Sequence, residues 1–239
     1  IRFRETVGGI GGDDSVAQYA WQTSASGLAG VWARENTREA IWDALARKEV
    51  FATTGTRIRV RVFAGYAFET GDLPRADFAK HGYATGVPMG ADLAADAEGR
   101  APRFLVRALR DPDGANLDRI QIVKGWLNAD GSTGERVHDV ACGGRDLLAA
   151  GCDGAVGDTV DPASASWTND IGAPFLAGYW EDPDFDTAQR AFYYARVLEI
   201  PTPRWTTIDA LVFGVYPPDG APVSIQERAY TSPIWFTPG

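Results

Sequence analysis

Two cysteines and two histidines offer the most versatile chemistry in this chain, and the spacing of the cysteines limits what they can do. Cys142 and Cys152 are the only cysteines and lie in one glycine-rich, loop-like segment. A disulfide that closes this loop is favoured over two free thiols, and it would place the protein outside the cytosol. A cysteine-based zinc site would need more ligands than this neighbourhood offers.

The two histidines do not provide a catalytic centre. His81 and His138 lie far apart in the sequence, so they cannot supply the two or three imidazoles of a typical catalytic zinc site. His138 follows a strand-like pattern beside Asp139, but neighbouring strand residues point to opposite faces. We expect His138 to be an ordinary strand residue and His81 to be solvated, and we assign no metal ligand to this chain.

Two acidic segments are candidates for calcium, which prefers several oxygen ligands from one or two loops. Neither has the spacing of an EF-hand, in which glycine occupies loop position 6 and glutamate position 12. Asp-Pro-Asp-Gly is strong turn chemistry, so the segments are expected to be solvated turns. Their residues are Asp111, Asp113, Asn116 and Asp118 in the first, and Asp182, Asp184 and Asp186 in the second.

Aromatic residues are plentiful, with eight Trp and eight Tyr. Rings on one face of a β-sheet can stack on sugars, although large rings more often fill cores and rims. The most unusual stretch, residues 192–207, contains Tyr194 and Trp205, which are candidate ligand-binding residues.

Charged side chains in the same stretch either pair with each other or serve a site. Structural pairing is the favoured interpretation for Arg196 and Glu199, which lie among apolar neighbours. Pro201 and Pro203 are expected to end the strand and to hold Arg204 and Trp205 in an extended segment. Arg204 is a candidate catalytic residue on these grounds.

Two further candidates, Arg34 and Glu35, lie between a predicted strand and a predicted helix. The pattern predicts a helix over 37–48, capped by Asn36 or Thr37. Short apolar segments at 28–32 and 50–55 predict a strand on each side, which is the βαβ order of an α/β domain. Such sheets bind ligands at strand ends, but the start of a capped helix explains both residues as well.

After Gly55 the pattern becomes mainly β. Ile58, Val60 and Val62 alternate with Arg57, Arg59 and Arg61, which indicates a strand with one solvated face. About eight short strands favour a β-sandwich, Ig-like or jelly-roll-like, over a barrel enzyme. Residues 128–134 predict a hairpin turn, and 71–100 an irregular excursion with at most a short strand or helical turn. The remaining predicted strands are 103–109, 119–125, 135–141, 191–200, 210–215 and 234–237.

Composition excludes several classes of protein. The 239 residues are 45% hydrophobic and carry a formal charge of −9, which is an ordinary globular composition. No apolar run approaches the roughly 20 residues of a membrane helix, and no basic cluster predicts binding of nucleic acid. The glycine-rich segment 7–14 lacks the strand and helix of a phosphate-binding loop, so a plain loop is expected there.

Four segments resemble one bacterial family. Gly27-Leu-Ala-Gly-Val-Trp-Ala-Arg-Glu-Asn-Thr-Arg-Glu-Ala-Ile-Trp-Asp-Ala-Leu45, Val50-Phe-Ala-Thr-Thr-Gly55, Leu198-Glu-Ile-Pro-Thr-Pro-Arg-Trp-Thr-Thr207 and Tyr230-Thr-Ser-Pro-Ile-Trp235 are similar to the C-terminal half of domain of unknown function 3604. The resemblance covers essentially the whole chain. It implies a larger exported protein with an N-terminal metallohydrolase-like (PHP-like) domain, which would hold most metal ligands. It also implies a cysteine pair in the same loop.

These observations lead to two expectations of function. The first is the C-terminal portion of a periplasmic or secreted metal-dependent hydrolase, with residues 1–55 as the βαβ remnant of the PHP-like domain and 56–239 as the sandwich. Its partner would be the N-terminal half of its own precursor, its cofactor a zinc, manganese or iron ion held there, and its substrate an unknown small molecule or polymer. This chain alone would not be catalytic. The alternative is a noncatalytic β-sandwich module that binds carbohydrate or another ligand.

Overall fold

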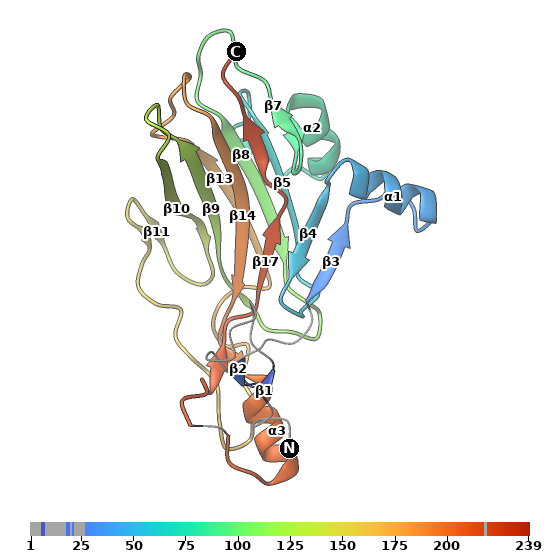
Figure 1. Ribbon diagram of the computed structural model, residues 1–239, viewed down its shortest axis with the longest axis vertical. Coiled ribbons are helices and arrows are strands. Elements are labelled where there is room, and N and C mark those ends of the chain that lie inside the picture. The colour runs from blue at the N-terminus through green and yellow to red at the C-terminus, as the bar shows by residue number, and fades with distance from the viewer. Residues whose placement is uncertain (1–5, 8–17, 20, 22–26, 218) are drawn as a thin grey trace.

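Two β-sheets that lie face to face form the body of the protein. The computed structural model describes residues 6–7, 18–19, 21, 27–217 and 219–239. In Figure 1 the larger sheet faces the reader, the smaller sheet lies behind it, and helix α2 (Phe78–Thr85) lies on the smaller sheet. Apart from Val7, the glycine-rich loop expected at 7–14 lies outside the described residues.

The larger sheet has eight strands. Its main path runs β10, β9, β14, β17, β4, β3, with β18 beside β14 and β7 beside β18. Only the β7–β18 pair in this sheet is parallel. The strands are Leu28–Val31 (β3), Val50–Thr53 (β4), Asp92–Leu93 (β7), Leu117–Leu127 (β9), Thr133–Cys142 (β10), Ala191–Glu199 (β14), Arg228–Thr231 (β17) and Ile234–Phe236 (β18).

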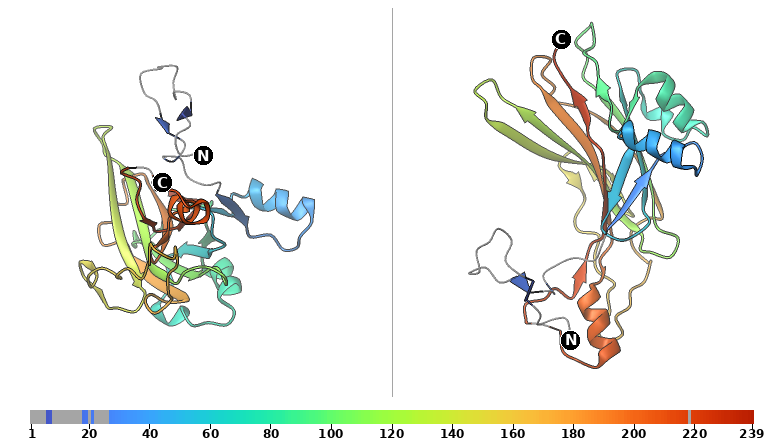
Figure 2. Two further views of the ribbon diagram at one scale, coloured as in Figure 1. Left: turned by 90° about the horizontal axis from the view of Figure 1, so that it is seen from below. Right: turned by 45° about the vertical axis from the view of Figure 1, so that its right-hand side comes forward.

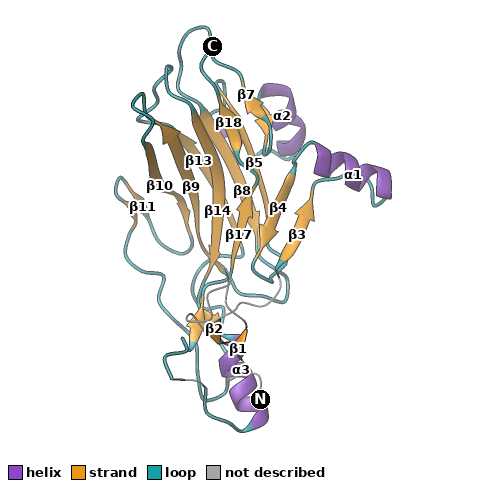
Figure 3. Cartoon of the chain, viewed as in Figure 1, coloured by secondary structure: helices purple, strands orange, loops and turns teal. Residues whose placement is uncertain are grey.

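The smaller sheet is antiparallel and has the order β13, β8, β5, β6. Its strands are Arg59–Gly65 (β5), Val87–Pro88 (β6), Arg103–Leu109 (β8) and Phe175–Glu181 (β13). Three short pairs complete the strands (Figure 3): Thr6–Val7 (β1) with Gln18–Tyr19 (β2), Leu147–Leu148 (β11) with Gly151–Cys152 (β12), and Thr202–Pro203 (β15) with Ser224–Ile225 (β16).

In the described part of the chain, three α-helices lie around the sheets. Helix α1 (Arg38–Ala46) projects to one side, α2 lies on the smaller sheet, and α3 (Trp205–Phe213) lies beyond the end of the sheets (Figures 1 and 2). A short 3-10 helix, Thr70–Asp72 (η3), precedes α2. No helix in the described part of the chain is long and apolar enough to span a membrane.

The inward faces of both sheets form one apolar core. Alternation along each strand directs every second side chain into it, as period-2 patterning requires. The fully buried residues include Val60 and Val62 from β5, Phe104 and Val106 from β8, Ile120 and Ile122 from β9, and Ala195 and Val197 from β14. The alternation predicted for residues 57–62 is therefore confirmed.

Helix α2 covers part of the outward face of the smaller sheet. Phe63 and Leu105 point outward from β5 and β8 and pack with Phe68 and Phe78 in a second apolar cluster. Gly82 allows this close approach, because a Cβ atom there would lie 2.4 Å from the Phe63 ring. The excursion expected at 71–100 thus contains more regular structure than a single helical turn.

A buried ion pair joins the two sheets. Lys124 Nζ, from β9, lies 2.6 Å from Asp182 Oδ2, just after β13, and both side chains are almost fully buried. Tyr193 Oη donates a 2.8 Å hydrogen bond to the same oxygen, and Lys124 donates to the Asp184 carbonyl. Buried charges need such partners. The expectation that Asp182 lies in a solvated turn is therefore wrong.

Most predicted strands are confirmed, including 103–109, which matches β8, and the hairpin turn between β9 and β10. The strand expected at 210–215 is wrong, because α3 occupies most of it. Trp205 begins this helix, so it does not lie in an extended segment. An apolar run of this length has no clear period, and Gly214 ends the helix in the left-handed conformation at φ 61°.

The βαβ order is also corrected. Strand, helix and strand follow one another as expected, but β3 and β4 pair antiparallel, whereas a βαβ unit has parallel strands. Helix α1 does not pack as a crossover helix would, since only Ala44 is buried and Trp42 is 70% exposed. The expected boundary at residue 55 falls between β4 and β5, which belong to different sheets. The division into two domains stays a prediction.

The start of α1 confirms one of the two expected caps. Thr37 is the N-cap, and its hydroxyl accepts a 3.3 Å hydrogen bond from the Ala40 amide. Glu39 is therefore the second helical residue and not the third, which is the position that a capping box requires.

A disulfide between Cys142 and Cys152 links the β11–β12 hairpin to the end of β10, which confirms the expected pairing. Replacing both cysteines by alanine should lower the free energy of unfolding by about 2–3 kcal/mol, because the open loop gains entropy in the unfolded chain. Urea unfolding of both proteins measures the difference. The difference in free energy of unfolding should vanish when the wild-type protein is reduced. Equal stability of the variant and the oxidised wild-type protein would contradict the prediction.

Candidate functional site

Four aromatic rings form a continuous strip on the outward face of the larger sheet. This aromatic strip consists of Trp235 on β18, Phe192 and Tyr194 on β14, and Tyr230 on β17. Successive ring centroids are 5.3, 6.4 and 6.3 Å apart, and the planes of Phe192 and Tyr194 differ by only 9°. Trp235 is 43% exposed and the other three rings are half-buried. No described helix lies in front of β14 and β17 in Figure 1.

The alternation of β14 places these rings. Ala191, Tyr193, Ala195 and Val197 are buried in the core, so the residues between them point outward. Tyr194, a ligand-binding candidate from the sequence, therefore lies in the middle of the strip. Sequence reasoning counted Trp235 among the tryptophans of the β portion that could stack on a ligand. It did not bring Phe192, Tyr230 and Trp235 together with Tyr194, because the strip depends on how β14 pairs with β17 and β18.

Glycine on the neighbouring strand gives Phe192 its position. Gly125 of β9 is the direct cross-strand partner of Phe192, and a Cβ atom there would lie 2.3 Å from the ring. The ring therefore lies over the β9 backbone. Gly134 of β10 and Trp126 of β9 form a similar pair, in which a Cβ atom on Gly134 would lie 2.2 Å from the Trp126 ring. Such aromatic cover over a strand glycine stabilises and orients the pair.

A hydrogen-bonded polar row flanks the aromatic strip. Arg196 Nε donates to Gln121 Oε1 at 2.7 Å, and Gln121 Nε2 donates to Asp139 Oδ1 at 2.7 Å. Asp139 also accepts from Arg119 and from the Cys152 amide. Within the described part of the chain, the terminal nitrogens of Arg196 have no hydrogen bond or ion pair, so the row presents oriented donors beside Tyr194 and Tyr230.

The candidates Arg34 and Glu35 follow β3 and precede α1, as expected, and both side chains are exposed. Neither forms an ion pair within the described residues. The structure does not bring them to Arg204 and Trp205, since α1 and α3 lie at well-separated places in Figure 1.

The contacts of Arg204 stabilise the start of α3. It is the N-cap of α3 and is only 8% exposed, and its guanidinium donates to the Thr206 hydroxyl and to the Trp21 carbonyl. The guanidinium also lies 5.3 Å from the Trp205 ring. Burial lowers the pKa of Arg204. These contacts hold the chain before α3 in place.

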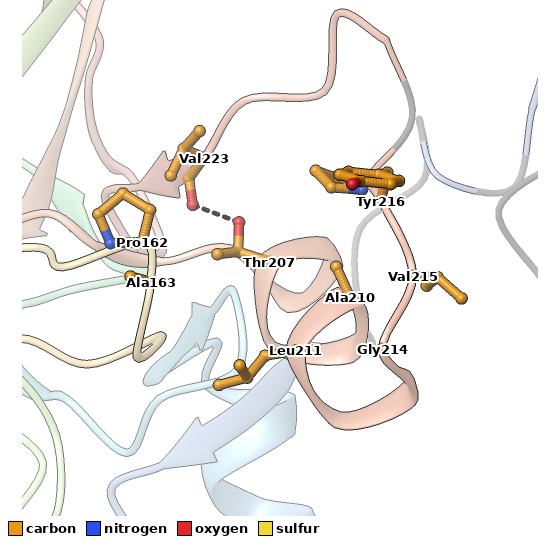
Figure 4. Close-up of a pocket in the computed structure, with 10 residues that line it drawn as sticks. Pro162, Ala163, Thr207, Ala210, Leu211, Gly214, Val215, Tyr216 and Val223 are labelled. Carbon is orange, nitrogen blue, oxygen red and sulfur yellow. Dashed lines mark hydrogen bonds between the residues drawn. The ribbon is translucent and has the colours of Figure 1, made fainter.

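A cavity of about 630 Å³ lies beside α3, but Arg204 and Trp205 are not among its lining residues. Figure 4 shows Leu211 and Tyr216 at its wall and the Thr207 hydroxyl donating to the Val223 carbonyl at 2.7 Å. Its lining contains no charged side chain. This cavity therefore offers an apolar surface without acid or base groups.

Glu199 does not pair with Arg196, so the structural pairing expected for these residues is wrong. Arg196 points outward from β14, whereas Glu199 is 1% exposed and points inward. Neither carboxyl oxygen of Glu199 has a hydrogen-bond partner among the described residues. Burial is the main cause that raises the pKa of Glu199 to about 8. The charges of Glu227 and Asp111 contribute to this rise, and the nearby Thr56 hydroxyl offsets part of it.

The other acidic and histidine candidates also have structural partners. Asp111 is buried beside Arg57, and Asp118 is fully buried beside Arg119 and Arg145, so these two residues are not solvated as expected, whereas Asp113 is exposed. His81 Nε2 lies 3.0 Å from Asp72 rather than in solvent. His138 lies on β10 with its ring centroid 4.8 Å from Trp180. Among the described residues, no group of three or more His, Cys, Asp and Glu is arranged to hold a metal.

Comparison with known proteins gives one finding. The family model described as "Protein of unknown function (DUF3604)" matches residues 4–238, which confirms the family expected from the sequence. No curated protein and no solved structure matches the chain.

The buried Glu199 makes a prediction about pH. An unfolded glutamate ionises near its ordinary pKa of 4.5, whereas the folded protein keeps this proton up to about pH 8. Unfolding therefore releases a proton between these values, and the group's contribution to stability falls by at most about 1.4 kcal/mol per pH unit. Glu199→Gln should remove this dependence. Urea unfolding at pH 5, 6.5 and 8 should show the variant gaining stability relative to wild type as the pH rises, and parallel curves would refute the assignment.

Proposed function

Since the chain belongs to the family described as DUF3604, proteins of unknown function, we propose its role from its geometry: it is a noncatalytic module that binds carbohydrate on the aromatic strip. The observation that carries this proposal is the row of four neighbouring rings across β18, β14 and β17, with Tyr194 at its centre.

The chemistry of the strip suits a sugar chain. The apolar faces of pyranose rings pack against aromatic rings, and the phenol groups of tyrosine add a polar edge. Arg196 and Gln121 lie beside the rings in fixed hydrogen bonds, so donors and acceptors for sugar hydroxyls are oriented before a ligand binds. A strip across several strands fits an extended oligosaccharide better than a compact metabolite.

The fold and the disulfide support two further parts of the proposal. Two face-to-face sheets with one shared core are compatible with a β-sandwich, Ig-like or jelly-roll-like. The disulfide supports an exported location, periplasmic or secreted, where such a bond persists and where polysaccharides are available.

The metal-dependent hydrolase expected from the family resemblance stays a prediction. It would require zinc, manganese or iron bound in stoichiometric amount in a protein that contains both this chain and the N-terminal half. Metal analysis of that protein tests this expectation independently of sugar binding.

Replacing Tyr194 by alanine should weaken sugar binding at least tenfold, which corresponds to about 1.4 kcal/mol for the loss of a central ring contact. Isothermal titration calorimetry with cellohexaose, xylohexaose, mannohexaose and chitohexaose identifies the preferred sugar for the wild-type protein and then measures the variant. Trp235→Ala, at the exposed end of the strip, should also weaken binding.

Tyr216→Ala provides a matched control, because Tyr216 is 96% exposed and lies beside α3, outside the strip. It should bind as the wild-type protein does. Thermal unfolding checks that Tyr194→Ala folds, and Trp235→Ala keeps the test decisive if it does not. The proposal is wrong if the wild-type protein binds none of the four hexasaccharides or if both strip variants bind like the control.

A further inference from the structure

The outward face of the smaller sheet has a second site of different chemistry. A cavity of about 300 Å³ opens there between β5, β8, β13 and α2. We call it the arginine pocket, and its principal lining residues are Trp32, Arg59, Arg61, Phe78, Arg107 and Phe175. No acidic residue is among the residues that line it. Arg59 and Phe175 are exposed, so the pocket is open to solvent.

Two like charges lie opposite each other in this pocket. Arg61 of β5 and Arg107 of β8 are direct cross-strand partners. Arg59 lies two residues before Arg61 on β5 and points to the same face. Like charges in this arrangement destabilise a sheet. The inward burial of Val60 and Val62 nevertheless directs Arg59 and Arg61 to this face.

Aromatic rings hold two of these guanidinium groups in place. The Arg61 guanidinium lies 4.3 Å from the centroid of the Trp32 ring, and the Arg107 guanidinium lies 4.1 Å from that of Phe78. The indole of Trp32 is itself fixed by a 2.9 Å hydrogen bond to the Val60 carbonyl. The donors are therefore preorganised beside apolar surface.

The positive charge of the pocket is only partly neutralised. Arg61 pairs with the buried Glu49 at 3.3 Å. Arg107 donates only to the carbonyls of Leu73 and Arg75, and burial alone shifts its pKa, downward, with no carboxylate acting on it. The Arg59 side chain has neither a hydrogen bond nor an ion pair within the described ranges.

From this geometry we propose that the arginine pocket binds a small organic carboxylate with a flat apolar body. The carboxylate is held by Arg59 together with the neighbouring arginines, because a guanidinium matches a carboxylate in a two-point hydrogen bond. The apolar body packs against Phe78 and Phe175. The site lies on the opposite side of the molecule from the aromatic strip, so this inference does not rest on the proposed sugar binding.

The test uses benzoate as the probe and its neutral analogue benzamide as the comparison. In ¹⁵N-resolved NMR titrations of the whole chain, benzoate should shift the Trp32 indole N–H resonance in a saturable manner, and benzamide should bind at least tenfold more weakly. Arg59→Ala should weaken benzoate binding at least tenfold. The same change at Arg190, an exposed arginine just before β14, should have no effect.

Three results would overturn the inference: no saturable shift with benzoate, equal affinity for benzoate and benzamide, or unchanged binding by Arg59→Ala. Inorganic sulfate provides a further arm. If sulfate binds as tightly as benzoate, the pocket recognises charge alone and the apolar part of the proposal is wrong. Because the Arg59 side chain has no hydrogen bond or ion pair within the described residues, its removal should leave the fold intact, and thermal unfolding checks this.

Discussion

The shared core between the two sheets is the constraint on which the rest of the molecule depends. The strands of both sheets direct one face into this core, so only their other face is available for ligands. On β14 the available face contains aromatic rings, and on β5 and β8 it contains arginines. The aromatic strip and the arginine pocket are thus two outward faces of one packed structure, which separates their chemistries by the thickness of the core.

Charge burial is the second organising feature. Lys124, Asp182 and Glu199 are almost fully buried, and so is Asp118, which contacts the partly exposed Arg119 and Arg145. Lys124 and Asp182 are paired at hydrogen-bond distance, as is Asp118 with its arginines, which offsets their desolvation. Glu199 instead avoids the penalty by keeping its proton. This fold therefore buries ionisable groups in two ways, as charged pairs and as a neutral carboxyl.

Local patterns predicted the elements better than the sites. Alternation at 57–62, the apolar run of β8 and the turn at 128–134 are short-range signals, and each was confirmed. Two of the wrong predictions depend on tertiary contacts: Asp182 is buried because Lys124 reaches it from another sheet, and β3 and β4 are antiparallel because α1 does not cross back over the sheet. The disulfide was predictable because both cysteines lie in one loop. Tyr194 was a candidate, and Phe192 lies on the same strand, but Tyr230 and Trp235 join the strip from other strands.

The glycine and aromatic pairs across the larger sheet restrict how its sequence can vary. In the Gly125–Phe192 and Gly134–Trp126 pairs, and also between Gly30 of β3 and Phe51 of β4, the ring occupies the volume that a side chain on its partner would need. A side chain at any of these glycines must displace the ring opposite. The two members of each pair are therefore expected to change together during evolution. A large residue on one strand should remain opposite a small residue on the neighbouring strand.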